Sequence, residues 1–560
     1  MLLRGCSLPA AFRRWAVSVP LALLTTLAVY ALWGPTAAPC CSGMLPSWAP
    51  IGPSPSSKSS DDLLSIPELS GPPILPVSEH AAFCDKRFTA AYLDDLRSHA
   101  LQYCEPVSGK MPQSRLTCFH AHVRDDKNAD SFCFGSGASW DPAAKKFRLD
   151  CPVIHKLDAN ETAHGIVPFD SITLAWFDTG PRRVFSGFVS LAPGEPVVVP
   201  AENKPAAHGL DKPPDKEAFV ILVKREGNNN LWHSLMEIWS MMNSVDVLRI
   251  ARRGGGDDGI PFFQAPDDLD NTHVVMLDDY AEESTFDLWR FFGPRNPIVK
   301  LHEMISDPLK VPLPLQQPGR NVNIIVPLPG GSNPLWQNDW VVRDCRNVPL
   351  LKLLVRRVFE HYQVPRAVGP RPTAANDNTN AKDIVVTFID RRGSRRLLNQ
   401  GPLFEKLQER YPNVLIEQLD FATLSLRDQL SIVQDTDVLV GVHGAGLTHT
   451  MFMREGAGAV VEIQPENLGH KGFRNLAAMM GVKYFSAQAE MVLPGEVEDE
   501  ETGKATDKGG SGTSAIRRRA DADKPWQSSH VRMEEDRFLA LMDVAIKSLY
   551  NEGTRNHQIV

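Results

Sequence analysis

Residues 383–490 alternate apolar, strand-like runs with helix-like segments, and this alternation restricts the possible folds more than any other feature of the chain. The strand-like runs are continuously apolar, which is typical of a parallel sheet covered by helices on both faces. Right-handed crossovers between such strands predict a doubly wound, Rossmann-like α/β domain. The expected strands are IVVTFID, VLIEQLD, DVLVGVH, AVVEIQP and KYFSAQ, and the expected helices are PLFEKLQERY, LSLRDQLSIVQDT with Ser425 as its cap, a short helix from about Leu447, and FRNLAAMMG.

The stretch VGVHGAGLTH, residues 440–449, places a histidine and two glycines where the third of these strands ends. Gly444 and Gly446 lack a Cβ, so the backbone can turn tightly and approach a ligand closely. The helix that follows presents free N–H groups, which favour a phosphate. His443 can donate to that phosphate or handle a proton. The predicted phosphate-binding set is His443, Gly444, Ala445, Gly446, Leu447 and Thr448. The alternative is a glycine turn whose histidine is only hydrogen-bonded in the core.

Other motifs of this kind are weaker. GGGDDG at 254–259 fits G-x-G-x-x-G, but its aspartates would repel phosphate and Pro261 opposes a following helix, so we interpret it as a loop. Asp268 and Asp270 have the D-x-D spacing with which some sugar transferases hold a metal, and a solvated loop is the alternative. No G-x-S-x-G nucleophile elbow occurs in the sequence, which argues against an esterase-type hydrolase.

The N-terminal residues predict a membrane anchor. Arg4, Arg13 and Arg14 precede an uncharged apolar stretch, residues 15–33, and no lysine or arginine follows until Lys58. This length suits a single span, and the charge asymmetry places residues 1–14 in the cytosol. We therefore expect a single-pass type II protein of the Golgi or endoplasmic reticulum membrane, with its bulk in the lumen. A cleaved signal peptide is the alternative.

Cysteine usage and charge agree with a lumenal protein. Six cysteines downstream of the stem form an even set whose disulfide pairing the sequence leaves open: Cys84, Cys104, Cys118, Cys133, Cys151 and Cys345. No CxxC pair is present, which disfavours a zinc site. Asn160 begins the sequon NET and is a predicted N-glycosylation site. The formal net charge of −8 argues against nucleic acid as a partner.

Composition divides the chain into seven segments. We predict a cytosolic tail (1–14), an anchor (15–33), a flexible stem rich in Pro and Ser (34–79), an N-terminal α/β domain with a connecting helix (80–365), a C-terminal Rossmann-like domain (366–493), a disordered charged loop (494–527) and a C-terminal helix (528–560).

Several of these segments together resemble glycosyltransferase family 61. The likeness is carried by VGVHGAGLTHTMFM with VVEIQP behind it, by TFIDRRGSRRLLN (387–399) and by LSLRDQL (424–430). NLWHSLMEIWS resembles the family's Asn-x-x-His segment, here Asn230 and His233. The stem, the cysteine-bearing region and the charged loop contribute little to it.

The resemblance implies a GT-B architecture, in which two Rossmann-like domains face a cleft and the C-terminal one holds a nucleotide-sugar. It also implies an inverting transferase that moves N-acetylglucosamine or xylose from a UDP-sugar to a hydroxyl on a protein or glycan acceptor. A non-catalytic sugar- or glycoprotein-binding protein on the same scaffold is the alternative. A nucleotide-dependent oxidoreductase ranks last, since a well-placed dinucleotide fingerprint is lacking.

The resemblance also suggests residue roles. Arg391, which corresponds to the family's strand-end arginine, or Arg396 would neutralise the departing UDP, although RRGSRR is alternatively a solvated basic loop. Glu462 would accept hydrogen bonds from the ribose, and His233 would be the base for the acceptor hydroxyl. Positive side chains can replace a metal at the diphosphate, so we expect no obligatory metal, with Mn²⁺ left open by Asp268 and Asp270.

Overall fold

The computed structural model describes residues 79–104, 114–121, 129–153, 156–193, 217–227, 230–253, 259–316, 321–371, 384–493, 525–550 and 556–559. All of them belong to the unit that spans residues 58–560. The predicted tail, the anchor, the stem except for its last residue, and residues 494–524 of the predicted loop lie outside the described residues. Within the described ranges, no helix combines the length and the apolar character that crossing a membrane requires.

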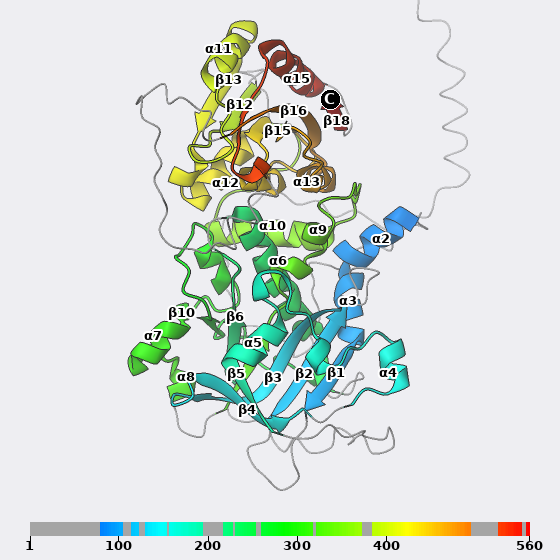
Figure 1. Ribbon diagram of the computed structural model, residues 1–560, viewed down its shortest axis with the longest axis vertical. Helices are drawn as coiled ribbons and strands as arrows, with labels where there is room; N and C mark the ends of the chain where they lie inside the picture. The colour runs from blue at the N-terminus through cyan, green and yellow to red at the C-terminus, as the bar shows by residue number, and fades with distance from the viewer. Residues whose placement is uncertain are drawn as a thin grey trace, which may run out of the picture. The chain divides into compact units, whose positions relative to one another are not determined.

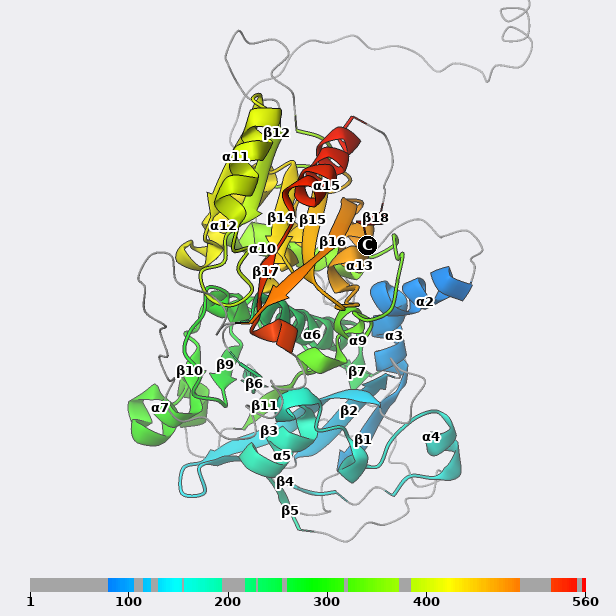
Figure 2. The ribbon, with the colours of Figure 1, turned by 45° about the horizontal axis from the view of Figure 1, so that its top comes forward.

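The C-terminal sheet is parallel through its five central strands, as the sequence predicts. The strand order is β13-β12-β14-β15-β16, with β17 antiparallel and β18 parallel to β16 at one edge (Figures 1 and 2). After β12 the chain crosses to β13 on one side and then to β14 on the other side of β12. The carboxyl ends of β12 and β14 therefore flank a topological switch point, where open α/β sheets bind ligands. The bounds are β12 Ile384–Ile389, β13 Val414–Leu419, β14 Val438–Val442, β15 Ala459–Pro465, β16 Lys483–Val492, β17 His530–Arg532 and β18 Asn556–Ile559.

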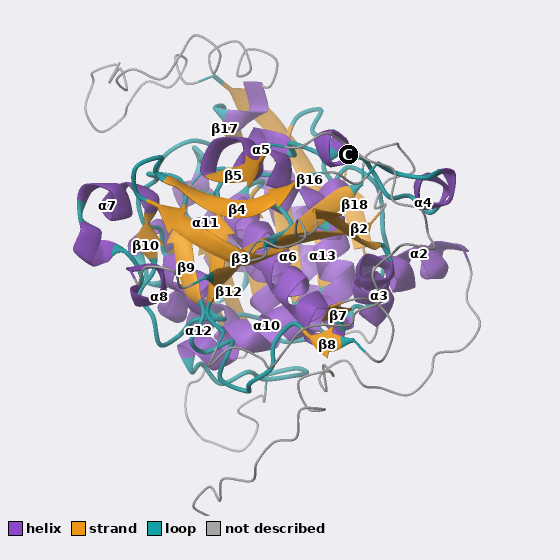
Figure 3. Cartoon of the chain, turned by 90° about the horizontal axis from the view of Figure 1, so that it is seen from below, coloured by secondary structure: helices purple, strands orange, loops and turns teal. Residues whose placement is uncertain are grey.

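Helices cover this sheet because its strands are apolar on both faces. Ser425 caps α12 as predicted, since its Oγ accepts the N–H of Asp428 at 3.2 Å. In Figure 3, coloured by element type, helices flank the strands. The helices are α11 (Gln400–Arg410), α12 (Leu426–Asp435), α13 (Gly472–Met480) and α15 (Glu535–Ser548).

The segment after β14 differs from the expected α-helix. Residues Ala445–Phe452 form a 3-10 helix, η11. Gly446 lies so close to Ile389 that an added Cβ would be 3.0 Å from the Ile389 side chain. Short-range bonds hold the tighter helix, with Thr450 Oγ1 donating to the Leu447 carbonyl at 2.7 Å and His449 Nδ1 donating to the Gly446 carbonyl at 2.8 Å.

The N-terminal sheet is mixed rather than wholly Rossmann-like. Its order is β1-β2-β3-β11-β6-β9-β10, parallel from β11 to β10 and antiparallel from β1 to β11. In addition, β4 pairs with β3, and β5 pairs with β4. Strands β1, β2 and β3 are consecutive in sequence and pair antiparallel, whereas crossover connections are needed for parallel pairing. The bounds are β1 Ala100–Cys104, β2 Arg115–Ala121, β3 Asp130–Asp141, β4 Lys146–Pro152, β5 Val189–Ala192, β6 Phe219–Val223, β9 His273–Met276, β10 Val299–Lys300 and β11 Val322–Val326.

Helix α6 (Leu231–Ile250) lies between the two sheets (Figures 1 and 2). Of its 20 residues 16 are buried, so it is apolar on nearly every side, as expected of a helix enclosed by protein. It packs against η11 of the C-terminal half and against η9 (Gly330–Ser332) of the N-terminal half. One hydrophobic core therefore runs through both halves.

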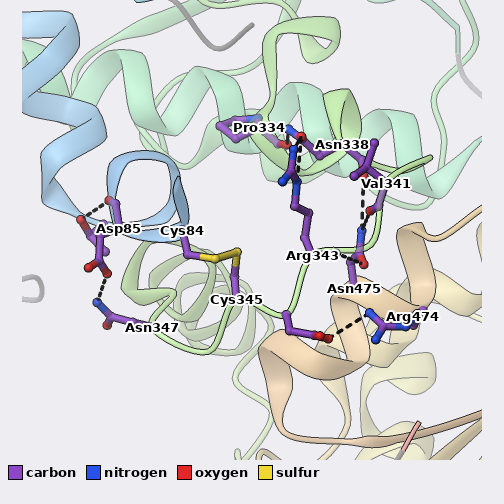
Figure 4. Close-up of a disulfide and its surroundings, with 12 residues drawn as sticks. Cys84, Asp85, Pro334, Asn338, Val341, Arg343, Cys345, Asn347, Arg474 and Asn475 are labelled. Carbon is purple, nitrogen blue, oxygen red and sulfur yellow. Dashed lines mark hydrogen bonds and ion pairs between the residues drawn. A yellow bond between two sulfur atoms is a disulfide. The ribbon is translucent and has the colours of Figure 1, made fainter. Parts of the chain in front are cut away.

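Three disulfides pair the six cysteines that the sequence left open: Cys84–Cys345, Cys104–Cys151 and Cys118–Cys133. Cys84 lies on α2 (Glu79–Phe88), so its bond joins the start of the described chain to a segment 261 residues later (Figure 4). That segment, residues 334–345, contains α9 (Pro334–Gln337) and is called the strap below.

The strap is also bound to the C-terminal half through Asn475 of α13 (Figure 4). The Asn475 side chain accepts the N–H of Arg343 at 2.8 Å and donates to the carbonyls of Val341 at 2.7 Å and Asn338 at 3.2 Å. Asn475 is fully buried, so the side chain that makes these bonds is itself shielded from water. An ion pair of Arg474 with Asp344, 2.9 Å long, reinforces the attachment.

We predict that the double variant C84S/C345S is less stable than the wild type by about 2–4 kcal/mol, because a long loop closed by a disulfide restricts the unfolded chain most. The free energy of unfolding in urea, without reductant, measures the loss. C118S/C133S is the matched control, since its disulfide spans 15 residues and should stabilise less. An equal or larger loss in this control would contradict the loop-length argument.

Candidate functional site

The carboxyl ends of β12 and β14 bring two arginines over the predicted glycine turn. Gly444 has φ of +153°, and a Cβ added there would lie 2.7 Å from Arg391 Nη1 and 3.0 Å from Arg395 Nη1. Only glycine therefore allows both guanidinium groups to cover this turn. Among the described residues, the N–H groups of Gly444, Ala445 and Gly446 find no hydrogen-bond acceptor. The turn thus combines unbonded backbone donors with two positive side chains.

Neither arginine forms an ion pair with a carboxylate within the described part of the chain. Arg391 Nε donates to the Ser394 carbonyl at 3.0 Å, and Arg395 Nη1 donates to the His443 carbonyl at 3.3 Å, while Arg395 Nε is buried without a partner. Burial lowers the pKa of Arg395 to about 9, with a further contribution from the charge of Arg391. Burial also lowers the pKa of Arg391, against the opposing influence of Asp420. Two partly desolvated like charges this close favour a bound anion.

Arg395, rather than the predicted Arg396, joins Arg391 at this site. Arg396 instead serves the fold through its backbone: its N–H donates to His530 Nδ1 at 3.3 Å and its carbonyl accepts the N–H of Val531 at 2.8 Å. Arg395 has a left-handed φ of +58°, which breaks the regular alternation of side chains along the loop. The sequence RRGSRR offered four arginines and no signal for this backbone conformation.

His443 lies beside the turn, and hydrogen bonds that involve Glu462 and Tyr484 orient its ring. Its Nδ1 donates to Glu462 Oε1 at 2.5 Å, and Tyr484 Oη donates to Glu462 Oε2. Burial acts to raise the pKa of Glu462, but the bonds from His443 and Tyr484 outweigh it and leave this pKa lowered. Burial lowers the pKa of His443 more than Glu462 raises it. A neutral imidazole thus faces an ionised carboxylate, and Nε2 keeps its lone pair.

This arrangement changes the assignment of Glu462. The residue is fully buried and both of its oxygens are already bonded, so neither remains for the ribose hydroxyl predicted from the sequence. Leu447 and Thr448 are fully buried as well, and the Leu447 N–H bonds to the Gly444 carbonyl at 2.9 Å. Thr448 Oγ1 is buried and has no hydrogen-bond partner among the described residues. Of the predicted phosphate-binding set, Gly444 therefore lies directly against the arginines.

Two further side chains that the sequence did not indicate enclose His443. The His470 ring lies 4.7 Å from the His443 ring and the Trp526 ring 5.4 Å from it, both distances between centroids. Arg395 also lies over Trp526, 5.9 Å from its ring centroid. Trp526 belongs to a 3-10 turn, Pro525–Gln527, within the segment predicted to be disordered. Its surroundings of polar, low-complexity sequence gave no sign of this packing.

The strap of the N-terminal half reaches the same place. His470 Nε2 lies 3.3 Å from Asp339 Oδ2, while His470 Nδ1 accepts the N–H of Gly472 at 3.2 Å. The ring of Trp340 packs edge-on against His470, with centroids 5.2 Å apart. Both sheets therefore contribute residues around His443.

His233 lies at the first turn of α6, on the N-terminal side. Asn230 caps this helix, its Oδ1 accepting the N–H groups of Trp232 at 3.1 Å and His233 at 3.4 Å. The His233 ring contacts Trp336 and its Nδ1 is paired with Glu226. Burial lowers the pKa of His233 to about 4, so the imidazole is neutral at physiological pH. Neutral imidazole is the form that accepts a proton.

A buried acidic cluster behind His233 was also missed. Burial raises the pKa of Glu283 to about 7 and raises that of Glu237 well above its usual value. Ser234 Oγ donates to both oxygens of Glu283 at 2.9 Å, and Glu237 lines a cavity of about 20 Å³ with Lys224. This volume is enough for about one water molecule.

The D-x-D motif is engaged in local structure. Asp268 Oδ2 accepts the N–H groups of Gln264 at 2.8 Å and Ala265 at 2.9 Å, and Asp270 pairs with Arg295 at 3.3 Å. In the described ranges no group of three or more His, Cys, Asp or Glu side chains has an arrangement suited to a metal. Asn160, the predicted glycosylation site, is exposed on the short helix α4 (Ala159–Ala163).

Comparison with known proteins supports a specific family. The family model described as Glycosyltransferase 61 matches residues 269–460, a range that contains Arg391, Arg395, His443 and Gly444. His233, Glu462, His470 and Trp526 lie outside it.

Similar proteins include the EGF domain-specific O-linked N-acetylglucosamine transferases. That of Drosophila melanogaster is 27% identical over 49% of this chain and 46% of its own length. That of Bos taurus is 30% identical over 27% of each chain, and that of Mus musculus is 26% identical over 27% of each chain. The chain thus spans less than half the length of the curated relatives it matches. Residues 269–460 of the chain are thus similar to glycosyltransferase family 61, and the chain is distantly similar to the EGF domain-specific transferases.

Proposed function

We propose that this protein transfers a sugar, N-acetylglucosamine or xylose, from a UDP-sugar to a hydroxyl of a protein acceptor. One observation carries the proposal: two partly desolvated guanidinium groups, Arg391 and Arg395, cover a glycine turn at the switch point without a carboxylate to neutralise them. A diphosphate supplies the missing charge. The similarity to this family and the activity in the relatives' names support the choice of a nucleotide-sugar.

In this proposal the two halves act as in a GT-B enzyme. The C-terminal sheet binds the UDP moiety at the Gly444 turn, and α6 of the N-terminal half presents the base. The acceptor oxygen forms a bond to the anomeric carbon of the sugar while the bond from that carbon to the diphosphate oxygen breaks. His233 takes the proton of the acceptor hydroxyl, and Arg391 and Arg395 stabilise the negative charge on the departing UDP.

Glu462, Tyr484 and His443 then act in positioning. The carboxylate fixes the imidazole so that Nδ1 carries its proton, which leaves Nε2 as an acceptor on the opposite edge of the ring. The proposal requires no obligatory metal, because the two arginines and the free N–H groups carry the charge stabilisation that a divalent ion otherwise provides.

The location we propose is the lumen of the endoplasmic reticulum or Golgi, with residues 15–33 as a type II anchor. The three disulfides suggest an oxidising compartment of the secretory pathway.

Replacing either arginine should abolish leaving-group stabilisation. We expect R391A and R395A each to lower kcat at least about 100-fold and to weaken UDP binding, because each removes a desolvated charge from the transition state. Radiolabelled transfer and the UDP-induced shift in Tm measure the two effects. R392A is the matched control, since Arg392 belongs to the same loop but is 68% exposed. Full turnover in R391A and R395A, with both variants folded, would refute the leaving-group role.

If His233 is the base, its replacement should slow sugar transfer without weakening UDP binding. H233Q should retain the UDP-induced Tm shift while transfer falls by about 10²–10⁴-fold. Because the pKa of His233 is lowered to about 4, wild-type kcat should fall only as the pH approaches 4, where the imidazole becomes protonated. This acid limb should be missing from the residual activity of H233Q. A wild-type profile with no ionisation near pH 4 would exclude His233 as the base.

Removal of metal tests the proposal that transfer requires no obligatory metal ion. Transfer by protein treated with EDTA and then freed of the chelator should be retained, and added Mn²⁺ should not be required. Complete loss of transfer that Mn²⁺ restores would show that the arginines do not suffice.

A further inference from the structure

We propose that four aromatic rings beside His233 form a docking ledge for the apolar surface of a folded protein acceptor, next to the hydroxyl that receives the sugar. The ledge consists of Trp176, Phe177, His233 and Trp336. This inference rests on the proposed function and specifies its acceptor class.

The rings of the ledge follow one another without a gap. Ring centroids are 5.5 Å apart between Trp176 and Trp336, 4.3 Å between Trp336 and His233, and 6.1 Å between His233 and Phe177. His233 is therefore one member of the row. An acceptor whose hydroxyl reaches His233 must lie over the neighbouring rings.

The outer members of the ledge are exposed to solvent. Trp176 is 44% exposed and Phe177 60% exposed, and Leu174, in the same short segment, is 42% exposed. Three large apolar side chains exposed so close together are unusual on a protein surface, and such clusters mark interaction sites. Tryptophan and phenylalanine at the centre of an interface supply much of its binding energy.

The backbone of this segment is held in an unfavourable conformation. Ala175, Phe177 and Asp178 have φ values of +56°, +57° and +54°, in the left-handed region that non-glycine residues rarely adopt. Backbone strain of this kind persists where the surrounding structure enforces it, and it concentrates at functional sites.

Specific contacts enforce the conformation. Lys224 Nζ donates to the Phe177 carbonyl at 3.2 Å, and Thr179 Oγ1 donates to the Trp176 carbonyl at 3.0 Å. Gly180 donates to the Leu174 carbonyl at 2.8 Å and lies so close to Thr173 that an added Cβ would be 2.5 Å from its carbonyl oxygen. The fold thus presents Trp176 and Phe177 outward in a fixed position.

The strap connects the ledge to the arginine site. Trp336 is part of α9, Asp339 is bonded to His470, and the His470 ring packs against His443. Trp340, 55% exposed, continues the apolar surface along this path. Because Asn475 and the Cys84–Cys345 disulfide hold the strap, the ledge keeps a fixed distance from the anion site.

The tilt of the rings favours a protein over a glycan. Successive ring planes are inclined by 64°, 39° and 51°, so the ledge has no common flat face. A glycan chain stacks best on coplanar rings, whereas side chains of a protein surface fill the notches between tilted ones. The exposed aliphatic residue Leu174, in the same segment as Trp176 and Phe177, adds apolar surface of the same kind.

The test uses the double variant W176A/F177A of the full chain and a recombinant, folded EGF-like domain as the acceptor probe. We expect KM for this domain to rise at least tenfold while the UDP-induced Tm shift is retained. L309A is the matched control, because Leu309 is 86% exposed on a different surface segment, and its KM should equal that of the wild type. An unchanged KM in W176A/F177A overturns the proposal.

A second measurement separates failure of the ledge from failure of the proposed function. Calorimetric titration of the EGF-like domain into wild type and W176A/F177A, with UDP present, reports docking without turnover. Binding to the wild type that the double variant loses supports the ledge even where no transfer is detected. Absence of binding to the wild type overturns it, as does an equal loss of affinity for chito-oligosaccharides in the double variant, which would identify a glycan subsite.

Discussion

The bonds of the Asn475 side chain hold the two halves of this protein in register. One buried carboxamide accepts the Arg343 N–H and donates to two carbonyls of the strap. Removing such a buried amide leaves several backbone groups unsatisfied at once, which costs far more than one exposed hydrogen bond. The strap in turn carries Trp336 and Asp339, so the surroundings of both His233 and His443 depend on this attachment.

Strand order explains where the positive charge gathers. The chain leaves β12 and β14 in opposite directions, which puts the carboxyl ends of both strands at a topological switch point. Gly444 provides the space, and Arg391 and Arg395 fill it with charge that burial makes costly, as the pKa of about 9 for Arg395 indicates. In the function we propose, the diphosphate of the nucleotide-sugar offsets this cost.

The C-terminal sheet was predictable because its strands β12 and β14 are buried on both faces and therefore appear as nearly continuous apolar runs, IVVTFI and VLVGV. The turn at Gly444 and the cap at Ser425 were also predictable, because each depends on the type of a single residue at the end of a strand or helix. Local sequence patterns did not predict the helix type of η11 or the pairing of the N-terminal strands, because these depend on residues distant in sequence. Gly446 packed against Ile389 favours a 3-10 helix over an α-helix, and strands β1–β3 pair in hairpin order rather than through crossovers.

The candidate site depends on local and distant residues in the same way. The sequence placed His443, Gly444 and Arg391 at strand ends, and the structure brings these residues together, because glycine and a strand end are local signals. Arg395 was missed because its role depends on a left-handed φ, and Glu462 received the wrong role because its burial depends on Tyr484 in the next strand. Trp526 and the disulfide partners are fixed only by tertiary contacts.

The arginine loop has a consequence for how the molecule matures. The Arg395 N–H is bonded to the Ser529 carbonyl and the Leu398 N–H to the Val531 carbonyl, across more than 130 residues. During synthesis this loop cannot reach its final geometry until residues as far as Val531 have left the ribosome. Contacts so remote in sequence form late, so strands β12 to β16 should pair before this loop becomes ordered.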